Sequence, residues 1–241
     1  MAKKITGVIP TAKLERPGNL EDHIFYGLTL DEEQKVFRDA IWNDEVQFVG
    51  VNGKAGCGKT LIALATAILL VKHGVYDRII YCVSPYGYER VGLLPGDLTQ
   101  KTEVFFEPLY QALITCNEIP ERAIATDALV NQKYDDGNSG FITAMTHTFT
   151  RGSNWEKTIT ILDEAQNFTE ADLRKSLTRV CEGSKVVVIG HSGQIDLPNP
   201  NASGFERCLK HFENKNDPRA KICTLSKNYR SWVADTADEH W

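Results

Sequence analysis

The chain has 241 residues, with 27 Lys and Arg against 32 Asp and Glu, so its formal net charge is −5. Hydrophobic residues make up 42% and charged residues 24%, a balance that excludes a disordered chain. Glycine and proline, at 18 and 9 residues, occur at ordinary frequency and exclude a collagen-like chain. The acidic balance argues against a protein that coats nucleic acid through charge alone.

The cysteines and the apolar runs bear on the cellular compartment. None of the six cysteines forms a CxxC pair, and scattered single cysteines are typical of a reducing compartment. The longest apolar run, residues 61–71, is shorter than the roughly 20 residues that span a bilayer. The first residues lack the apolar stretch of a secretory signal. We therefore expect a cytoplasmic protein without a membrane partner.

In the first half of the chain, the expected elements alternate between helix and strand. Thr29 and Glu32 fit a capping box at the start of a helix. An apolar strand over 46–51 leads through a glycine-rich turn into an Ala/Leu-rich helix that stops at Gly74. The next strand is expected over 78–83.

The second half continues this alternation, which is typical of a parallel sheet with helices on both faces. Residues 1–22 show no periodicity and are expected to form a flexible or loosely docked arm, whereas residues 23–241 are expected to form one α/β domain. Residues 84–97 and 134–140 are loops by composition. Helices are expected over about 98–116, from Pro120, over about 169–181 and over 204–212, and strands over 141–145, 158–162, 185–190 and 220–226.

The glycine-rich turn at residues 53–60 has the sequence GKAGCGKT. It matches the GxxxxGK[ST] phosphate-binding loop, here called the P-loop, in the strand–turn–helix context that the motif needs. Glycines let successive backbone N–H groups surround phosphate oxygens, and the helix N-terminus adds partial positive charge. Lys59 is expected to reach the β- and γ-phosphates and Thr60 to bind Mg²⁺. The predicted nucleotide-binding residues of the loop are Gly53, Lys54, Ala55, Gly56, Cys57, Gly58, Lys59 and Thr60.

Two acidic residues follow the strand at 158–162. Ligands of open parallel sheets sit at the carboxyl ends of the strands, so Asp163 is expected to hold Mg²⁺ directly or through water. Glu164 would then polarise the attacking water as the general base. A protein that only senses a nucleotide, or a simple kinase, does not need this second acid. The pair therefore favours hydrolysis of a nucleoside triphosphate.

Further polar residues are candidates for contacts to the γ-phosphate. Gln194, in the loop after the next core strand, is expected to act as a catalytic sensor, and Gln166 is a second candidate. Arg230 would neutralise charge that develops on the γ-phosphate, in cis or from a neighbouring subunit. Arg151 and Gly152 are candidates for a substrate or interface contact. In each case an ordinary polar surface residue is the alternative.

Gln34 and two aromatic residues upstream of the P-loop are candidates for recognition of the base. A glutamine amide can form two hydrogen bonds with adenine, and the ring of Phe25 or Tyr26 could stack on it. This arrangement would select ATP over GTP. A solvated helical glutamine beside core aromatic residues is the alternative.

Together these residues resemble the PhoH-like family of P-loop ATPases, which is similar to the first RecA-like domain of superfamily 1 helicases. The resemblance covers about residues 28–230 and implies a RecA-like P-loop NTPase fold, ATP and Mg²⁺ as ligands, ATPase activity and a helicase-related role on RNA or DNA. His191 stands where the family usually has Asp. The segments that carry the resemblance are GKAGCGKT (53–60), RVGLLPGDLTQKTEVFFEPLYQAL (90–113), ILDEAQN (161–167) and LTRVCEGSKVVVIGHSGQIDLPN (177–199). The NYRS segment at 228–231 also resembles an Arg-bearing motif of superfamily 1 helicases.

A helicase of this superfamily closes two motor lobes around ATP, and this chain is long enough for one. Motor action would then need a dimer or ring with ATP at the subunit boundary. We therefore expect an ATP hydrolase that is a homo-oligomer and acts on single-stranded RNA or DNA, the nucleic acid being implied by the resemblance alone. The alternatives are a P-loop kinase for a small molecule and a non-hydrolysing ATP-binding regulator.

Overall fold

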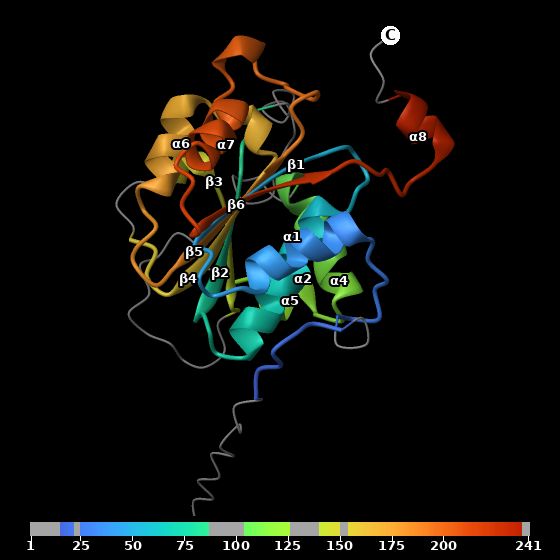
Figure 1. Cartoon of the computed structure of the whole chain (residues 1–241), viewed down its shortest axis with the longest axis vertical. Helices are drawn as coiled ribbons and strands as arrows, with labels where there is room; N and C mark the ends of the chain where they lie inside the picture. Colours follow the sequence, from blue (N-terminus) through green and yellow to red (C-terminus); the bar gives the residue numbers. More distant parts are fainter. Residues whose placement is uncertain (1–14, 22–24, 87–103, 126–139, 150–153, 238–241) are drawn as a thin grey trace, which may run out of the picture.

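The computed structural model describes residues 15–21, 25–86, 104–125, 140–149 and 154–237. Within these residues, six strands form one sheet in the order β3-β2-β4-β5-β1-β6, and every neighbouring pair is parallel (Figure 1). The prediction of a parallel α/β sheet is therefore confirmed. The strands are β1 (Phe48–Gly53), β2 (Arg78–Val83), β3 (Ile142–Thr146), β4 (Thr158–Asp163), β5 (Lys185–Gly190) and β6 (Ala220–Leu225).

The burial pattern of the strands reflects their position in the sheet. Every residue of β4 and β5 is buried, because both faces of these central strands are covered. Strand β6 lies at one edge, and only two of its residues, Cys223 and Leu225, are buried. Strand β5 lies between β1 and β4, so the P-loop strand and the acidic strand are next-but-one neighbours.

Helices cover both faces of the sheet and form two hydrophobic clusters. The larger cluster joins the sheet to α1, α2 and α4, and the smaller joins it to α6 and α7. Helix α8 stands apart from the body near the C-terminal end of the described chain (Figure 1). The helices are α1 (Glu32–Trp42), α2 (Lys59–Lys72), α4 (Glu107–Thr115), α5 (Pro120–Ala123), α6 (Glu170–Leu177), α7 (Phe205–Glu213) and α8 (Trp232–Ala237), with 3₁₀ turns η2 (Val104–Phe106), η3 (His147–Phe149), η4 (Ala165–Asn167) and η5 (Pro200–Ala202).

Helix α2 connects the P-loop to the core. Its Ala/Leu-rich sequence is buried over nine consecutive residues, from Ile62 to Leu70, so it packs between the sheet and its neighbouring helices. The backbone of Gly58 at its N-cap has φ 85°, a left-handed conformation that favours glycine. The helix ends at Lys72, and Gly74 follows with φ 70°, close to the predicted stop.

The start of α1 differs from the prediction. Its N-cap is Asp31 rather than Thr29, and the side chain of Asp31 accepts a hydrogen bond from the Gln34 amide at 2.8 Å. In return Oε1 of Gln34 accepts from the Asp31 amide at 3.0 Å. The capping box is thus formed two residues later than predicted, because Asp and Gln satisfy the same free amides as Thr and Glu.

Of the predicted arm, residues 15–21 are described, and they contact the domain through Arg16 and Leu20, which fits the loosely docked alternative. Leu20 is buried, the guanidinium of Arg16 lies 4.3 Å from the ring centroid of Trp42, and Arg16 also pairs with Asp44. Residues 1–14 and 22 lie outside the described residues, as do most of the two predicted loops at 84–97 and 134–140. Of the helix expected over 98–116, residues 107–115 are helical, and α6 ends four residues before the predicted end.

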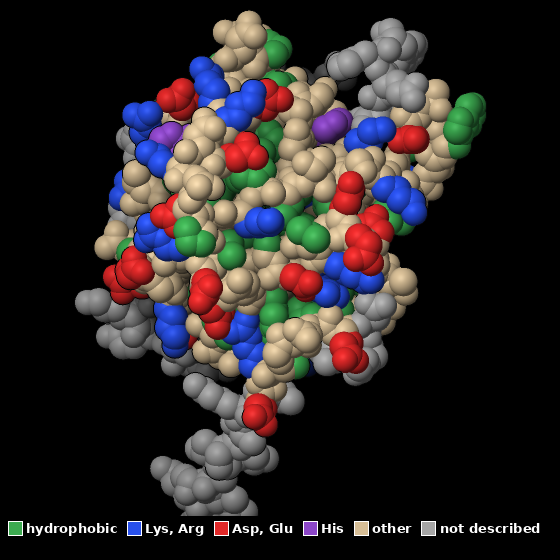
Figure 2. Space-filling model, viewed as in Figure 1, with side chains coloured by type: hydrophobic (Ala, Val, Ile, Leu, Met, Phe, Trp, Pro, Cys, Tyr) green, Lys and Arg blue, Asp and Glu red, His purple; other side chains and the backbone are tan. Residues whose placement is uncertain are grey.

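Charged side chains of both signs mix over the visible face. Figure 2 shows Lys and Arg interspersed with Asp and Glu rather than gathered into one patch of a single sign. None of the described helices combines the length and hydrophobicity that a membrane crossing requires.

Candidate functional site

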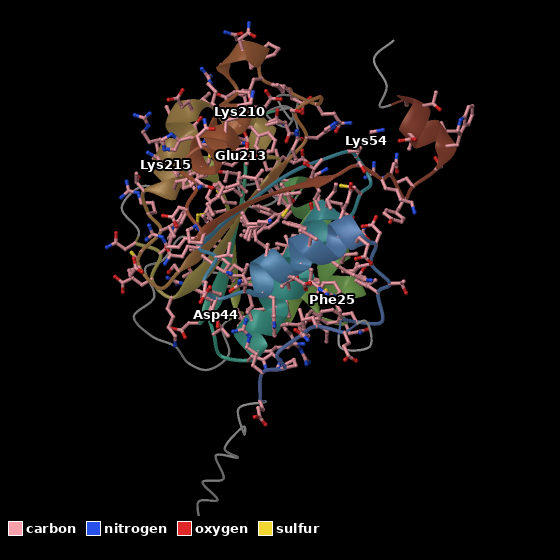
Figure 3. The ribbon with its side chains drawn as sticks, in the orientation of Figure 1. Phe25, Asp44, Lys54, Lys210, Glu213 and Lys215 are labelled. Atoms are coloured by element: carbon pink, nitrogen blue, oxygen red, sulfur yellow. The ribbon has the colours of Figure 1, made fainter. Side chains whose placement is uncertain are left out.

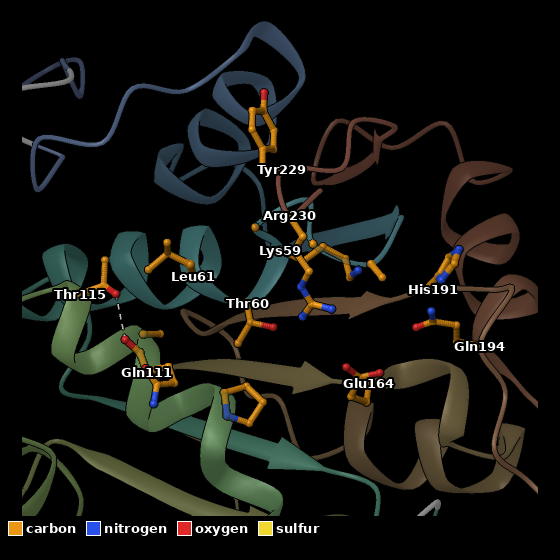
Figure 4. A pocket seen from close by; sticks show the side chains of 15 residues that line it. Lys59, Thr60, Leu61, Gln111, Thr115, Glu164, His191, Gln194, Tyr229 and Arg230 are labelled. Atoms are coloured by element: carbon orange, nitrogen blue, oxygen red, sulfur yellow. Dashed lines mark hydrogen bonds between the residues drawn. The ribbon is translucent and has the colours of Figure 1, made fainter. Parts of the chain in front are cut away.

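A cleft of about 390 Å³ lies at the carboxyl ends of the strands, where the P-loop faces helix α4 (Figure 4). Its remaining walls are the loops after β4 and β5 and the segment after β6. This edge is where open parallel sheets bind ligands, as the sequence predicts. The cleft is lined by Ala55, Gly56, Gly58, Lys59, Thr60, Leu61, Pro108, Gln111, Ala112, Thr115, Glu164, His191, Gln194, Tyr229 and Arg230.

The P-loop holds its lysine inside the loop. Nζ of Lys59 donates hydrogen bonds to the carbonyl oxygens of Gly53 at 2.7 Å and of Lys54 at 2.8 Å. These carbonyls keep the ammonium at the floor of the cleft, beside the N-terminus of α2. A phosphate placed there would meet the ammonium, the free amides at the start of the helix and its partial positive charge.

The predicted metal residues are in direct contact. The Thr60 hydroxyl donates to Oδ2 of Asp163 at 2.9 Å, and the Tyr81 hydroxyl donates to the same oxygen at 2.6 Å. Burial and, after it, the neighbouring charge of Glu164 raise the pKa of Asp163 to about 6, although the hydrogen bonds from Tyr81 and Thr60 act in the opposite direction. A buried carboxylate next to a hydroxyl is a hard oxygen donor set that fits Mg²⁺.

Glu164 reaches the cleft through an unusual backbone conformation. Its φ of 51° and ψ of 41° are left-handed, which costs a non-glycine residue about 1–2 kcal/mol. This turn directs the Glu164 side chain into the cleft while the Asp163 carboxylate stays buried below. Nε2 of Gln166 donates to Oε2 of Glu164 at 2.6 Å and fixes the carboxylate.

Gln166 also links the loop after β4 to the loop after β5. Its Oε1 accepts a hydrogen bond from the His191 amide at 3.0 Å. Asn167 and Asp196 join the same two loops through a pair of bonds at 2.7 and 3.0 Å. These bonds hold the loop that brings His191 and Gln194 to the cleft wall. The candidate sensor Gln194 therefore lies in the cleft, whereas Gln166 braces it from behind.

Residues 226–237, here called the C-terminal arm, bring two further residues to the cleft. The Tyr229 amide donates to the Gly56 carbonyl at 3.1 Å, so the arm lies directly on the P-loop. Arg230 points into the cleft between Thr60 and Glu164 (Figure 4). The predicted arginine is thus supplied by the same chain. Tyr229 was not predicted, although its place directly before Arg230 in NYRS was a signal.

The structure places the candidate base-recognition residues outside the cleft lining. Phe25 is fully buried, and in Figure 3 it lies on the other side of α1 from Lys54. Burial raises the pKa of Tyr26, whose ring lies under Lys72. The side chain of Gln34 contacts the P-loop and the helix start, because its Nε2 donates to the Cys57 carbonyl at 3.0 Å and its oxygen completes the capping box. Gln34 therefore contacts the back of the P-loop, and its contact with a base stays a prediction.

The remaining P-loop residues differ in whether they are buried, exposed to solvent or part of the cleft lining. Cys57 is buried against Gly53, and burial raises the pKa of its thiol, which fits a small packing residue. Lys54 points away from the cleft and pairs with Asp235 of α8 at 3.3 Å. Ala55, Gly56 and Gly58 present backbone to the cleft. Arg151 and Gly152 lie outside the described residues.

We expect Gly56→Ala to displace the C-terminal arm. A Cβ on Gly56 would lie 2.6 Å from Oδ1 of Asn228 and 2.7 Å from Cγ of Arg230, on a backbone with φ +72°. Gly183→Ala is the matched control, because its φ is +74° but nothing lies within 4 Å of the added Cβ. Thermal unfolding should show a loss of about 1 kcal/mol in both variants. Only Gly56→Ala should also lose ATP turnover, and equal turnover in the two variants would contradict this packing.

Comparison with known proteins identifies relatives along most of the chain. The model of the PhoH-like protein family matches residues 29–236. The chain is 34% identical over 187 residues to protein PhoH of Escherichia coli (strain K12), a match of 77% of this chain and 50% of that protein. It is 29% identical over 222 residues to protein PhoH2 of Bacillus subtilis (strain 168), covering 90% of this chain and 48% of that protein. The chain spans about half the length of the curated relatives it matches.

Parts of larger solved proteins also align with this chain. The arterivirus nonstructural protein 10 helicase with DNA aligns over 84% of this chain and 41% of its own, with 18% identity and a TM-score of 0.47. Pif1 from a Bacteroides species, in complex with ADP-AlF4, aligns over 85% and 43%, with 19% identity and a TM-score of 0.38. In both cases the chain covers less than half of the solved protein.

Proposed function

Because the chain belongs to the PhoH-like protein family and has its RecA-like P-loop NTPase fold, we propose that it binds ATP with Mg²⁺ and hydrolyses it. The observation that carries this proposal is the arrangement around Thr60. Its hydroxyl bonds to Asp163 at the floor of a cleft that Lys59 enters from one side and Glu164 from the other (Figure 4).

Each group has a chemical role in this proposal. Bound Mg²⁺ would neutralise charge on the phosphates, held by Thr60 and by Asp163 directly or through water. Lys59 would leave the carbonyls of the loop and bind phosphate oxygens. Glu164 would accept a proton from the attacking water, oriented by its bond from Gln166. Arg230 would neutralise the charge that develops on the γ-phosphate, and Gln194 would contact it from the opposite wall.

The ring of Tyr229 is the candidate for base stacking in place of Phe25 and Tyr26. It is a cleft-lining aromatic with 48% of its surface exposed. Its hydroxyl donates to the Asp31 carboxylate at 2.5 Å, and this hydrogen bond raises the pKa of Tyr229 to about 12. The ring is therefore fixed at the edge of the cleft, where a base would lie if the phosphates lie on the P-loop.

The partner, the assembly and the compartment belong to the same proposal. We propose that the ATPase acts on single-stranded RNA or DNA as a homo-oligomer in the cytoplasm. The nucleic acid follows from the family resemblance. The homo-oligomer is proposed by analogy with the two motor lobes that close around ATP in the helicases that this family resembles.

Phosphate release from ATP tests the proposed function and separates it from the alternatives. We expect Mg²⁺-dependent release by the purified chain, stimulated by single-stranded RNA or DNA. Release at the same rate with and without nucleic acid would contradict the proposed partner. Phosphate appearing only on an added small molecule would indicate a kinase, and ATP binding without release would indicate a regulator. Light scattering with and without ATP measures the oligomeric state.

A further inference from the structure

Hydrogen bonds and one ion pair connect the C-terminal arm to the domain. None of its residues from 226 to 237 is buried, and Trp232 and Val233 are 80% and 66% exposed. The arm nevertheless brings Arg230 to the cleft. Because none of the arm's residues is buried, we expect its hydrogen bonds to the domain to fix where Arg230 lies.

Glu33, on the first turn of α1, makes the most extensive of these contacts. One carboxylate oxygen accepts the Ser226 amide at 2.7 Å, and both oxygens lie 2.9 Å from the Ser226 hydroxyl. Hydrogen bonds to an ionised group are stronger than neutral ones. Ser226 directly follows β6, so this contact fixes the point at which the arm leaves the sheet.

The same helical turn contacts the arm again at Tyr229 and the P-loop at Gln34. Asp31 accepts the Tyr229 hydroxyl at 2.5 Å, and Nε2 of Gln34 donates to the Cys57 carbonyl at 3.0 Å. Burial would raise the pKa of Asp31, but the bond from Tyr229 and the backbone amides outweigh it and lower the pKa. One turn of α1 therefore connects the phosphate-binding loop to the arm that carries Arg230.

We propose that Glu33 is a positioning residue that clamps the C-terminal arm over the cleft and thereby sets Arg230 opposite the γ-phosphate. This inference rests on the proposed ATP hydrolysis. Glu33 does not line the cleft, so its effect on turnover passes through the arm. Losing the clamp frees the arm at Ser226, and Arg230 then spends less time between Thr60 and Glu164.

Variants of Glu33 and Ser226 provide the test. Glu33→Ala should lower turnover at saturating ATP by about threefold to tenfold, which corresponds to the loss of a few exposed hydrogen bonds. Ser226→Ala should lower it less, because the amide contact remains, and Glu33→Gln should retain more activity than Glu33→Ala because an acceptor remains. Glu32→Ala is the matched control, since Glu32 is the adjacent acid, 90% exposed and paired only with Lys35 among the described contacts.

The Arg230→Ala background distinguishes positioning from general structural damage. In the Arg230→Ala background, adding Glu33→Ala should cause no further loss of turnover. If Glu33→Ala lowers turnover by the same factor in wild type and in Arg230→Ala, the inference is overturned. Turnover of Glu33→Ala at the wild-type rate, while Arg230→Ala is impaired, would also overturn it and leave the proposed function standing.

Amide exchange provides a second readout that needs no ATP. In Glu33→Ala the amides of Ser226 and Tyr229 should exchange faster than in wild type and in Glu32→Ala. If Arg230→Ala hydrolyses ATP normally, the catalytic assignment of Arg230 fails and exchange alone decides whether Glu33 holds the arm. Unchanged exchange in Glu33→Ala would overturn the clamp.

Discussion

Glu164→Gln is expected to abolish ATP hydrolysis while leaving ATP binding intact. The amide keeps the size of the side chain and can still accept the bond from Gln166, but it cannot take a proton from water. General-base catalysis contributes about 10²–10⁴-fold, so turnover should fall by at least about a hundredfold. Phosphate release and nucleotide titration by calorimetry measure the two effects separately.

Glu170→Gln is the matched control for this variant. Glu170 is the next acidic residue along the chain, half exposed at the start of α6, where it pairs with Arg174 at 3.0 Å. Glu170→Gln removes one carboxylate, as Glu164→Gln does, but outside the cleft, so turnover should stay at the wild-type rate. A Glu164→Gln protein that hydrolyses ATP like this control would remove Glu164 from the mechanism.

Lys59→Ala is expected to weaken ATP binding as well as turnover. The ammonium would form charge-assisted hydrogen bonds with the phosphates, each contributing about 1.5–3 kcal/mol. Affinity for ATP should therefore fall about tenfold to a hundredfold, and turnover should fall with it. In the nucleotide-free protein the substitution also removes the hydrogen bonds from Lys59 to the carbonyls of Gly53 and Lys54. Thermal unfolding of the variant should therefore be measured as well.

Lys72→Ala is the control at the other end of the same helix. Lys72 pairs with Glu118 at 2.5 Å, far along α2 from the cleft. Lys72→Ala should change neither the affinity for ATP nor turnover. Equal ATP affinity in Lys59→Ala and Lys72→Ala would mean that the phosphates do not lie on the P-loop.

The fold and the floor of the cleft could be predicted because their signals are local. Short apolar runs indicate buried parallel strands, and the P-loop motif fixes its own backbone through its glycines and helix start. Asp163 and Glu164 were assigned from their place at a strand end, and the structure brings Asp163 to Thr60 over a sequence separation of 103 residues. That proximity follows from parallel topology, which sends all these strand ends to one edge.

The walls of the cleft depend on tertiary packing that no local pattern encodes. Gln34 is predicted to contact a base because it precedes the P-loop, and the sequence did not indicate that its side chain also completes a helix cap and bonds to the Cys57 carbonyl. Phe25 was assigned to stacking and is core. Tyr229 lines the cleft from a segment about 170 residues after the P-loop, since β6 pairs beside β1. Long-range strand order decides which aromatic residue reaches the site.

A crystal structure of the protein with Mg²⁺ and a non-hydrolysable ATP analogue would show directly where the nucleotide binds. We expect the triphosphate to lie along the P-loop, with the γ-phosphate within hydrogen-bond distance of Nζ of Lys59 and the metal on the Thr60 hydroxyl near Asp163. A nucleotide bound elsewhere on the protein, with Lys59 still bonded to the carbonyls of Gly53 and Lys54, would contradict this expectation.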